Sequence, residues 1–443
     1  MRPLAALSLL QLALWPTVAV ADEATGPFTI AASARLRLES IDGQFRPAPA
    51  PEDDTMVSLR TEIAASYDAG AVRFNAELWD VRAWGQDVRS SANTSEVNAL
   101  ELVQANVEVP LGGKNVLKLG RYTLDLGNRR MMARQRFRNT TNAFTGLHLA
   151  LDGGAGHKLD LVFTLPHQRL PDDVDGILAD RVRWDRENFD VMFFGAHGTL
   201  PNVAGGTLQP YAFALIERDG ARLATANRRI GTLGARHYAK AAAGKWDHDL
   251  EGAVQFGKAR RTSAPTDSAD LDVFAWFIHA ELGYTLTGGW TPRLVAMIDA
   301  ASGDGGKAGK FTRFDTLYSA RRFEFGPNGL YGPFRRSNIV SPSARLEVTP
   351  SKHTDAFIAW RSAWAENSRD QFASTGVRDA SGASGSLGGH QIEGRIRHWI
   401  MPGLLQVDAG AALLLKRRLL RDAPNAPASG NTRYGYIDLT LAL

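Results

Sequence analysis

From Phe28 to the end of the chain, apolar and polar residues alternate along most segments. In the first of these segments, Leu36 and Leu38 share one parity, whereas Arg35 and Arg37 share the other. The same alternation returns in residues 57–67, 405–415 and 435–443. Because successive side chains of a β-strand point to opposite sides of its sheet, a period of two predicts strands with one apolar and one polar face.

We count about eighteen such segments of roughly ten residues each, which is the length that a tilted strand needs to cross a bilayer. The predicted strands begin near residues 28, 55, 71, 98, 115, 144, 156, 190, 209, 229, 245, 271, 290, 338, 354, 390, 404 and 433. The pattern therefore predicts an all-β protein.

The connections between these strands alternate between short and long. Those after even-numbered strands are tight turns, such as residues 68–70 and 152–154. Those after odd-numbered strands are long and polar: residues 41–54, 127–143, 166–190, 302–337, 366–389 and 417–432. This order is typical of outer-membrane barrels, which have short periplasmic turns and long extracellular loops. We therefore predict that residues 22–443 form one closed antiparallel transmembrane β-barrel.

A barrel of about eighteen strands encloses more space than its side chains can fill. We expect the polar face of each strand to line a watery lumen and the apolar face to meet lipid. Aromatic residues near the predicted strand ends fit the girdles that barrels place at the two membrane interfaces. These residues are Trp79, Trp84, Trp246, Tyr284, Trp290, Trp364, Trp399, Tyr434 and Tyr436.

The first 21 residues have the three parts of a secretory signal peptide. Arg2 supplies a positive charge, residues 4–20 are mostly apolar, and residues 19–21 match an A-x-A cleavage site. We expect cleavage there, which leaves a mature chain that starts at Asp22. No later run approaches the roughly 18 consecutive apolar residues of a membrane helix. Together with the absence of cysteine, these features predict the outer membrane of a Gram-negative bacterium.

The total charge says little about a solute, because Lys and Arg number 51 against 47 for Asp and Glu. The positions of the charges say more, since one loop run holds five arginines and no acid among them: Arg129, Arg130, Arg134, Arg136 and Arg138. Further cations have the parity of the lumen-facing side: Arg35, Arg37, Arg60, Arg73, Lys118, Arg345, Arg395 and Arg397. Rings of Arg and Lys select anions, so all of these are candidate pore-lining residues.

An alternative interpretation is that these cations are neutralised in ion pairs between strands, because many acids share the same face. They include Glu39, Glu62, Glu77, Glu108, Glu347 and Glu393. In the loop run, Met131, Met132 and Phe137 are interleaved with the arginines as apolar anchors. We therefore expect residues 127–143 to fold into or over the lumen.

Two sequence blocks resemble one known family. Residues 120–127 (GRYTLDLG), followed by Arg138-Asn139 and residues 144–146 (FTG), resemble the GRxxLxxG, RN and F-x-G elements of the alginate-export family. Residues 301–304 (ASGD) and 314–318 (FDTLY) resemble its ASGD and F-x-P-L-F elements, although Thr316 stands at the proline position. The chain ends in Leu443, where many barrels end in an aromatic residue. The resemblance implies an eighteen-stranded monomeric barrel with an electropositive constriction, but not alginate itself as the solute.

The function that we expect is a channel for an anionic solute or an exported polysaccharide. The alternative is a porin for the uptake of small molecules, which the same architecture supports. An enzyme is a third class, but we find no HExxH or H-x-x-x-H spacing and no G-x-S-x-G motif. We therefore expect no catalytic residues, no metal and no cofactor. The expected partners are lipid, lipopolysaccharide and the solute, with no nucleic acid.

Overall fold

The computed structural model describes residues 26–443, so the predicted signal peptide, residues 1–21, lies outside the described residues. The strands are β1 Phe28–Asp42, β2 Asp53–Asp68, β3 Arg73–Trp84, β4 Asn98–Pro110, β5 Val116–Tyr122, β6 Phe144–Gly154, β7 His157–Pro166, β8 Val191–Val203, β9 Gly206–Glu217, β10 Arg229–Ala239, β11 Trp246–Ala259, β12 Leu271–Thr285, β13 Arg293–Ala301, β14 Lys310–Phe311, β15 Ile339–Ser351, β16 Thr354–Trp364, β17 Leu387–Met401, β18 Leu405–Lys416 and β19 Thr432–Ala442. The helices are α1 Val174–Leu178, α2 Arg322–Phe325 and α3 Arg418–Asp422.

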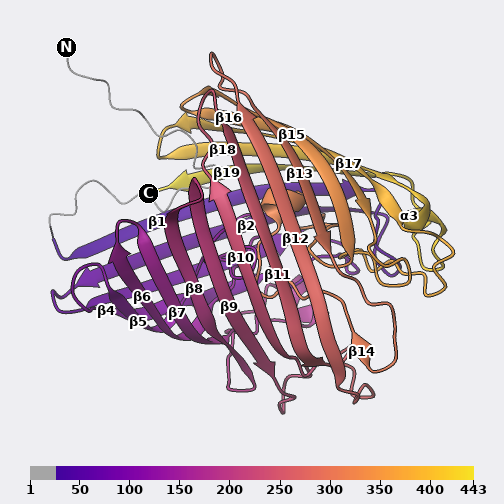
Figure 1. The fold of residues 1–443 in the computed structure, drawn as a ribbon, viewed down its shortest axis with the longest axis horizontal. Coiled ribbons are helices and arrows are strands. Elements are labelled where there is room, and N and C mark those ends of the chain that lie inside the picture. The colour runs from indigo at the N-terminus through magenta and orange to yellow at the C-terminus, as the bar shows by residue number, and fades with distance from the viewer. Residues whose placement is uncertain (1–25) are drawn as a thin grey trace.

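These strands form one closed antiparallel barrel (Figure 1). Each strand pairs with the next, and β13 pairs directly with β15 because the two-residue β14 lies in the intervening loop. The first and last strands close the barrel, with Ser33 opposite Ala442. The predicted eighteen-stranded fold is confirmed, and each barrel strand starts within about three residues of its predicted start. Among residues 26–443, no helix is long and apolar enough to cross a membrane.

The two ends of the barrel differ in their connections. When the two-residue β14 is left out of the count, every second connection between barrel strands is a turn as short as residues 155–156, whereas the connections between them are loops that reach residues 302–338. The start of β1 and the end of β19 lie at the end with the short turns (Figure 1). We call the two ends the turn end and the loop end. This arrangement places the loop end outside the cell.

The two faces of the strands show which side meets lipid. Leu36 and Leu38 are 48% and 45% exposed, whereas Arg35 and Arg37 are 2% and 1% exposed. A soluble protein has the reverse distribution. The apolar faces therefore point outward to lipid and the charged faces point into the barrel.

The predicted aromatic girdle is wrong for three residues, Trp79, Tyr434 and Tyr436, which are buried inside the barrel. The indole nitrogen of Trp79 donates to Glu77 at 2.7 Å, and the hydroxyl of Tyr434 donates to Glu39 at 2.6 Å. All three residues have the parity of the charged face. Their polar groups find acceptors there that a hydrocarbon environment cannot provide.

The loop end of the lumen is filled by long loops, whereas the sequence predicted a watery interior. Buried rings of these loops contact inward-facing rings of the strands, as in the pairs Phe137–Tyr436, Phe314–Phe277 and Tyr331–Tyr434, with centroids 5.0 to 5.1 Å apart. The loops carry enough apolar side chains to form a core against the barrel wall, and burial of that surface favours the inward conformation. Near the loop end, the polar faces of the strands therefore contact atoms of the loops.

Candidate functional site

The inner loop, residues 123–143, leaves β5 and runs into the barrel. In β5, Gly120 has a φ of 115°, and a Cβ there would lie 2.5 Å from the carbonyl oxygen of Ala105. The next side chain, Arg121, donates to Glu101 at 2.5 Å. The backbone of β5 can therefore take this conformation only because residue 120 is a glycine.

The inner loop pairs with a second loop, residues 302–338, inside the lumen. The Tyr318 amide donates to the carbonyl of Met131 at 3.0 Å, and the Ala320 amide donates to the carbonyl of Arg129 at 2.8 Å. Phe137 of the inner loop is only 3% exposed. The inner loop therefore lies within the barrel, as its apolar anchors predict. We call the two paired stretches, residues 129–138 and 316–325, the crossing segments.

Arg130 of the inner loop is surrounded by carboxylates. It forms ion pairs with Asp249 at 3.2 Å and Glu251 at 2.7 Å, both on β11, and with Glu324 at 2.9 Å. Burial disfavours the charged guanidinium, but the three carboxylates outweigh that effect and raise the pKa of Arg130. This arginine fastens the inner loop to the wall and to the second loop.

The other inner-loop arginines differ from one another. Arg134 pairs with Glu77 at 2.5 Å, and Arg136 pairs with Asp125 at 2.9 Å. Arg129 is 6% exposed, and burial lowers the pKa of its guanidinium. Arg138 forms no ion pair among the described residues. Its Nη2 donates instead to Asn142 Oδ1 at 3.0 Å.

Arginines of the first two strands hold the inner loop in place. Arg35 donates to the carbonyls of Arg136 at 3.0 Å and Phe137 at 3.1 Å. Arg60 donates to the same Arg136 carbonyl at 3.1 Å and pairs with a carboxylate of its own strand. The side chains of Arg35 and Arg60 therefore bind backbone carbonyls of the inner loop.

The remaining wall cations lie next to acids. The pairs are Arg37–Asp438 at 2.5 Å, Arg345–Glu347 at 2.6 Å, Arg397–Asp355 at 2.8 Å, Lys118–Glu108 at 2.9 Å and, at the turn-end rim, Arg73–Asp68 at 2.9 Å. Arg395 shares Asp355 with Arg397. These cations are therefore neutralised by acids, as in the alternative interpretation of the sequence, although the pair Arg345–Glu347 lies within one strand, β15.

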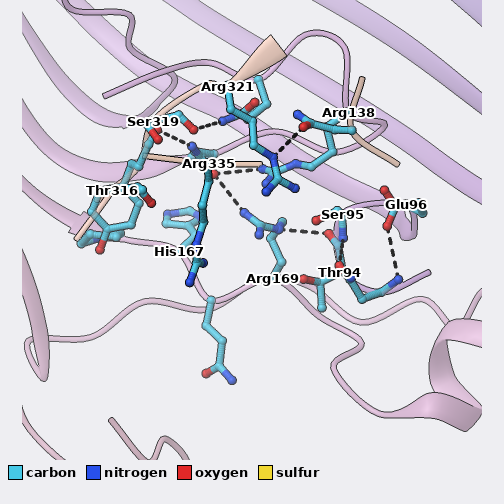
Figure 2. A pocket seen from close by; sticks show the side chains of 18 of the residues that line it. Thr94, Ser95, Glu96, Arg138, His167, Arg169, Thr316, Ser319, Arg321 and Arg335 are labelled. Atoms are coloured by element: carbon cyan, nitrogen blue, oxygen red, sulfur yellow. Dashed lines mark hydrogen bonds between the residues drawn. The ribbon is translucent and has the colours of Figure 1, made fainter. Parts of the chain in front are cut away.

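A cavity of about 540 Å³ lies among the loops at the loop end, and five arginines line it. They are Arg46, Arg138, Arg169, Arg321 and Arg335, and we call this site the arginine pocket. Figure 2 shows four of them directed toward one space, with Glu96 at its edge. The arginines come from four different loops. Glu96 and Asp172 are the acids that line the same cavity.

The arginines of the pocket are bonded to neutral groups. Arg46 donates to the carbonyl of Leu330 at 2.7 Å, Arg169 donates to the carbonyl of Thr94 at 3.0 Å, and Arg321 donates to an amide oxygen at 2.6 Å. Among residues 26–443, none of the five is in an ion pair with a carboxylate. Arg335 has a buried Nε atom without a hydrogen-bond partner. The arginines of the pocket therefore differ from most cations of the barrel wall, which are paired with acids.

The pKa values of the pocket arginines are lowered, which is consistent with burial next to few negative charges. Burial, together with the charges of Arg335 and Arg46, lowers the pKa of Arg321 to about 10. Burial lowers the pKa of Arg46 to about 10 as well. Burial and the charge of Arg169 lower the pKa of Arg138 well below its usual range. An anion bound among these groups relieves their mutual repulsion.

A second cavity, of about 440 Å³, lies nearer the turn end and contains both signs of charge. Arg293 there pairs with Glu281 at 2.6 Å and Glu347 at 3.2 Å, as well as with Asp247. Arg130 and Phe137 line this cavity, whereas Gln135 and Arg138 line the arginine pocket. The crossing segments therefore lie between the two cavities.

A family model described as alginate export matches residues 27–427. The chain belongs to the alginate-export family. Membership agrees with the fold, since the barrel exposes an apolar outer face and carries charge inside. This member of the family is therefore an outer-membrane channel. A comparison with curated protein sequences gives no match.

Solved structures of low sequence identity share the barrel. Pseudomonas aeruginosa OccK9 has a TM-score of 0.63 at 13% identity, with 94% of this chain and 98% of that chain covered. Acinetobacter baumannii OccAB1 has a TM-score of 0.60 at 12% identity, with 95% and 98% covered. Pseudomonas aeruginosa OccK2, solved in complex with glucuronate, has a TM-score of 0.56 at 12% identity, with 94% and 96% covered. At these identities, the likeness extends to the fold alone.

Sequence reasoning identified only Arg138 of the arginine pocket. It missed Arg46, Arg169, Arg321 and Arg335, because strand parity gives no direction for side chains in loops. One signal was present, since Arg321-Arg322 and Arg335-Arg336 are adjacent pairs within one long loop. Among the residues that the structure describes, no group of three His, Cys, Asp or Glu is arranged to hold a metal ion.

Proposed function

We propose that this channel passes a solute that carries acid groups, and that the arginine pocket is the site where the solute binds in the lumen. The observation that carries the proposal is the set of five arginines without a carboxylate partner. Guanidinium groups pair with carboxylates through two parallel hydrogen bonds, so five of them in one cavity favour such a ligand. Wall cations such as Arg37, Arg345 and Arg397 are already paired with acids and offer less to a passing anion.

Two structural neighbours add support, because both were solved with a carboxylate. Pseudomonas aeruginosa OccK2 was solved in complex with glucuronate, and OpdK of the same organism was solved with vanillate. A porin that passes small molecules without regard to charge is the alternative. It predicts that removal of pocket arginines leaves ion selectivity unchanged.

The test is the ion selectivity of the triple variant Arg138→Gln, Arg169→Gln, Arg321→Gln in planar bilayers. We expect the reversal potential in a KCl gradient to shift toward less anion preference at 0.1 M salt. The shift should be smaller at 1 M, where the Debye length falls from about 10 Å to about 3 Å. Glutamine keeps hydrogen-bonding capacity, so the loops retain part of their contacts.

A matched control removes three arginines that lie on the surface, Arg89, Arg418 and Arg433, whose side chains are 64%, 67% and 77% exposed. This control should keep the selectivity of the native channel. Equal selectivity in the native channel and the pocket variant, with both barrels folded, refutes the proposal and favours the uncharged porin.

Export by cleavage of the predicted signal peptide is part of the proposal. Mass spectrometry of the protein from outer membranes should show an N-terminus at Asp22. A retained Met1 contradicts this part and leaves the channel function untouched.

A further inference from the structure

The position of the arginine pocket bears on the direction of transport. All five arginines lie on long loops of the loop end, namely the loops after β1, β5 and β7 and the loop between β13 and β15. The crossing segments lie on the other side of the pocket, toward the turn end. A solute from outside the cell therefore meets the pocket before the crossing segments, whereas a solute from the periplasm meets it last.

The charge of the pocket indicates how many acid groups a ligand brings. Five guanidinium groups face two acids, Glu96 and Asp172, which leaves three positive charges without a partner. Burial lowers the pKa of Arg335, and the two acids that oppose this effect are already engaged, since Asp315 pairs with Arg228 and Asp370 pairs with Arg313. A ligand with three acid groups matches this excess.

The pocket also contains an acceptor that lacks a donor. Glu96 is 1% exposed, and its Oε1 atom has no hydrogen-bond partner among the described residues. Its other oxygen accepts from the amide of Asn93 at 3.3 Å. A buried carboxylate oxygen without a donor is unfavourable, and a ligand hydroxyl would satisfy it. Simple polycarboxylates do not carry such a donor, whereas hydroxy acids do.

The size of the pocket indicates a small ligand. A volume of about 540 Å³ lies within the usual range for small-molecule sites. Backbone hydrogen bonds between Met131 and Tyr318 and between Arg129 and Ala320 join the crossing segments below it. A polymer has to pass the crossing segments in extended form, whereas a compact solute can bind in the pocket on their loop-end side.

From these observations, we infer that the arginine pocket captures a small hydroxylated tricarboxylate from outside the cell, so that this barrel serves uptake. The inference rests on the proposed function and adds the solute class and the direction. In an exporter, a strong site at the exit would slow release of the solute, because conduction requires that the last site be weak. In an importer, the same site raises the local solute concentration where transport starts.

The test measures current block by citrate in planar bilayers that hold channels in one orientation. The chain has no cysteine, so a Ser263→Cys variant labelled with a membrane-impermeant thiol reagent reports which side carries the loops. Citrate is compared with tricarballylate, which lacks the hydroxyl, with acetate, and with a hexamer of galacturonate. Each probe is added first to the loop side and then to the turn side.

We expect citrate on the loop side to block at a concentration at least about tenfold lower than acetate, and lower than citrate on the turn side. The pocket triple variant should lose this difference. Glu96→Leu should remove the preference for citrate over tricarballylate, while a preference for both over acetate remains. Loss of the first preference with retention of the second shows that the variant lacks the hydroxyl contact and that its pocket is still folded.

Stronger block by the galacturonate hexamer than by citrate, or stronger block from the turn side, overturns the inference. In that case the proposed function still stands if the arginine variant loses anion selectivity. A channel without anion selectivity overturns both.

Discussion

The junction between the inner loop and the barrel wall can be tested through Arg130. This side chain is 2% exposed and contacts three carboxylates, Asp249, Glu251 and Glu324. Arg130→Met keeps the length of the side chain and removes its charge. In that variant Asp249 keeps its ion pair with Arg236 and Glu324 keeps its ion pair with Arg336, whereas Glu251 retains only the hydrogen bond from the Tyr211 hydroxyl.

The magnitude follows from burial. Removal of one partner from a buried ion pair costs about 3 to 5 kcal/mol when the other charge stays buried without a cation, which here applies to Glu251. The crossing segments are also joined by two backbone hydrogen bonds, from Tyr318 and Ala320, each of which contributes about 0.5 to 1.5 kcal/mol net. The loss at Arg130 is therefore as large as or larger than what these two bonds retain. We expect the inner loop to leave its place in the lumen.

Two measurements follow this change. Single-channel conductance in 1 M KCl should rise, because the crossing segments no longer fill the lumen. The midpoint of unfolding in urea, followed by the gel mobility of the unheated protein, should fall. The control is Arg136→Met on the same loop, since Arg136 and Asp125 are each 27% exposed and such pairs contribute about 0 to 1 kcal/mol.

Native conductance in the Arg130→Met channel would refute the reasoning, because the inner loop would then be held without this ion pair. The reasoning also fails if Arg136→Met changes both measurements as much as Arg130→Met does. Burial would then not decide which arginine fastens the loop.

Two further predictions concern single residues. Burial and the nearby charge of Glu39 raise the pKa of Glu96 to about 7, so Glu96 is protonated below that pH and a negative charge leaves the arginine pocket. Anion preference, measured by reversal potential, should rise as the pH falls from 8 to 6, and Glu96→Gln should abolish this step; an unchanged step in that variant would assign it to another group. Gly120→Ala forces a side chain into a φ of 115° against a backbone carbonyl, which costs about 1 to 3 kcal/mol. It should lower the urea midpoint, whereas an unchanged midpoint would show that β5 can adopt another backbone there.

The sequence by itself determined the barrel. Strand positions, the lipid-facing side and the short and long connections all follow from local alternation, because adjacent residues on a strand always point to opposite faces. Leu36 and Arg37 therefore reveal their environments without knowledge of any partner. Even the inward loop was predictable, since Phe137 and its neighbours are apolar within a polar run.

Only the tertiary structure decided which cations are neutralised and which are left for a solute. Arg130 meets Glu324, a residue 194 positions away, and Arg134 meets Glu77, 57 positions away. The arginine pocket likewise combines Arg138 with arginines of three other loops. No periodicity links such residues, because the contacts depend on how long loops pack inside a closed wall. The direction of a loop side chain depends on that packing, whereas the direction of a strand side chain depends only on its parity.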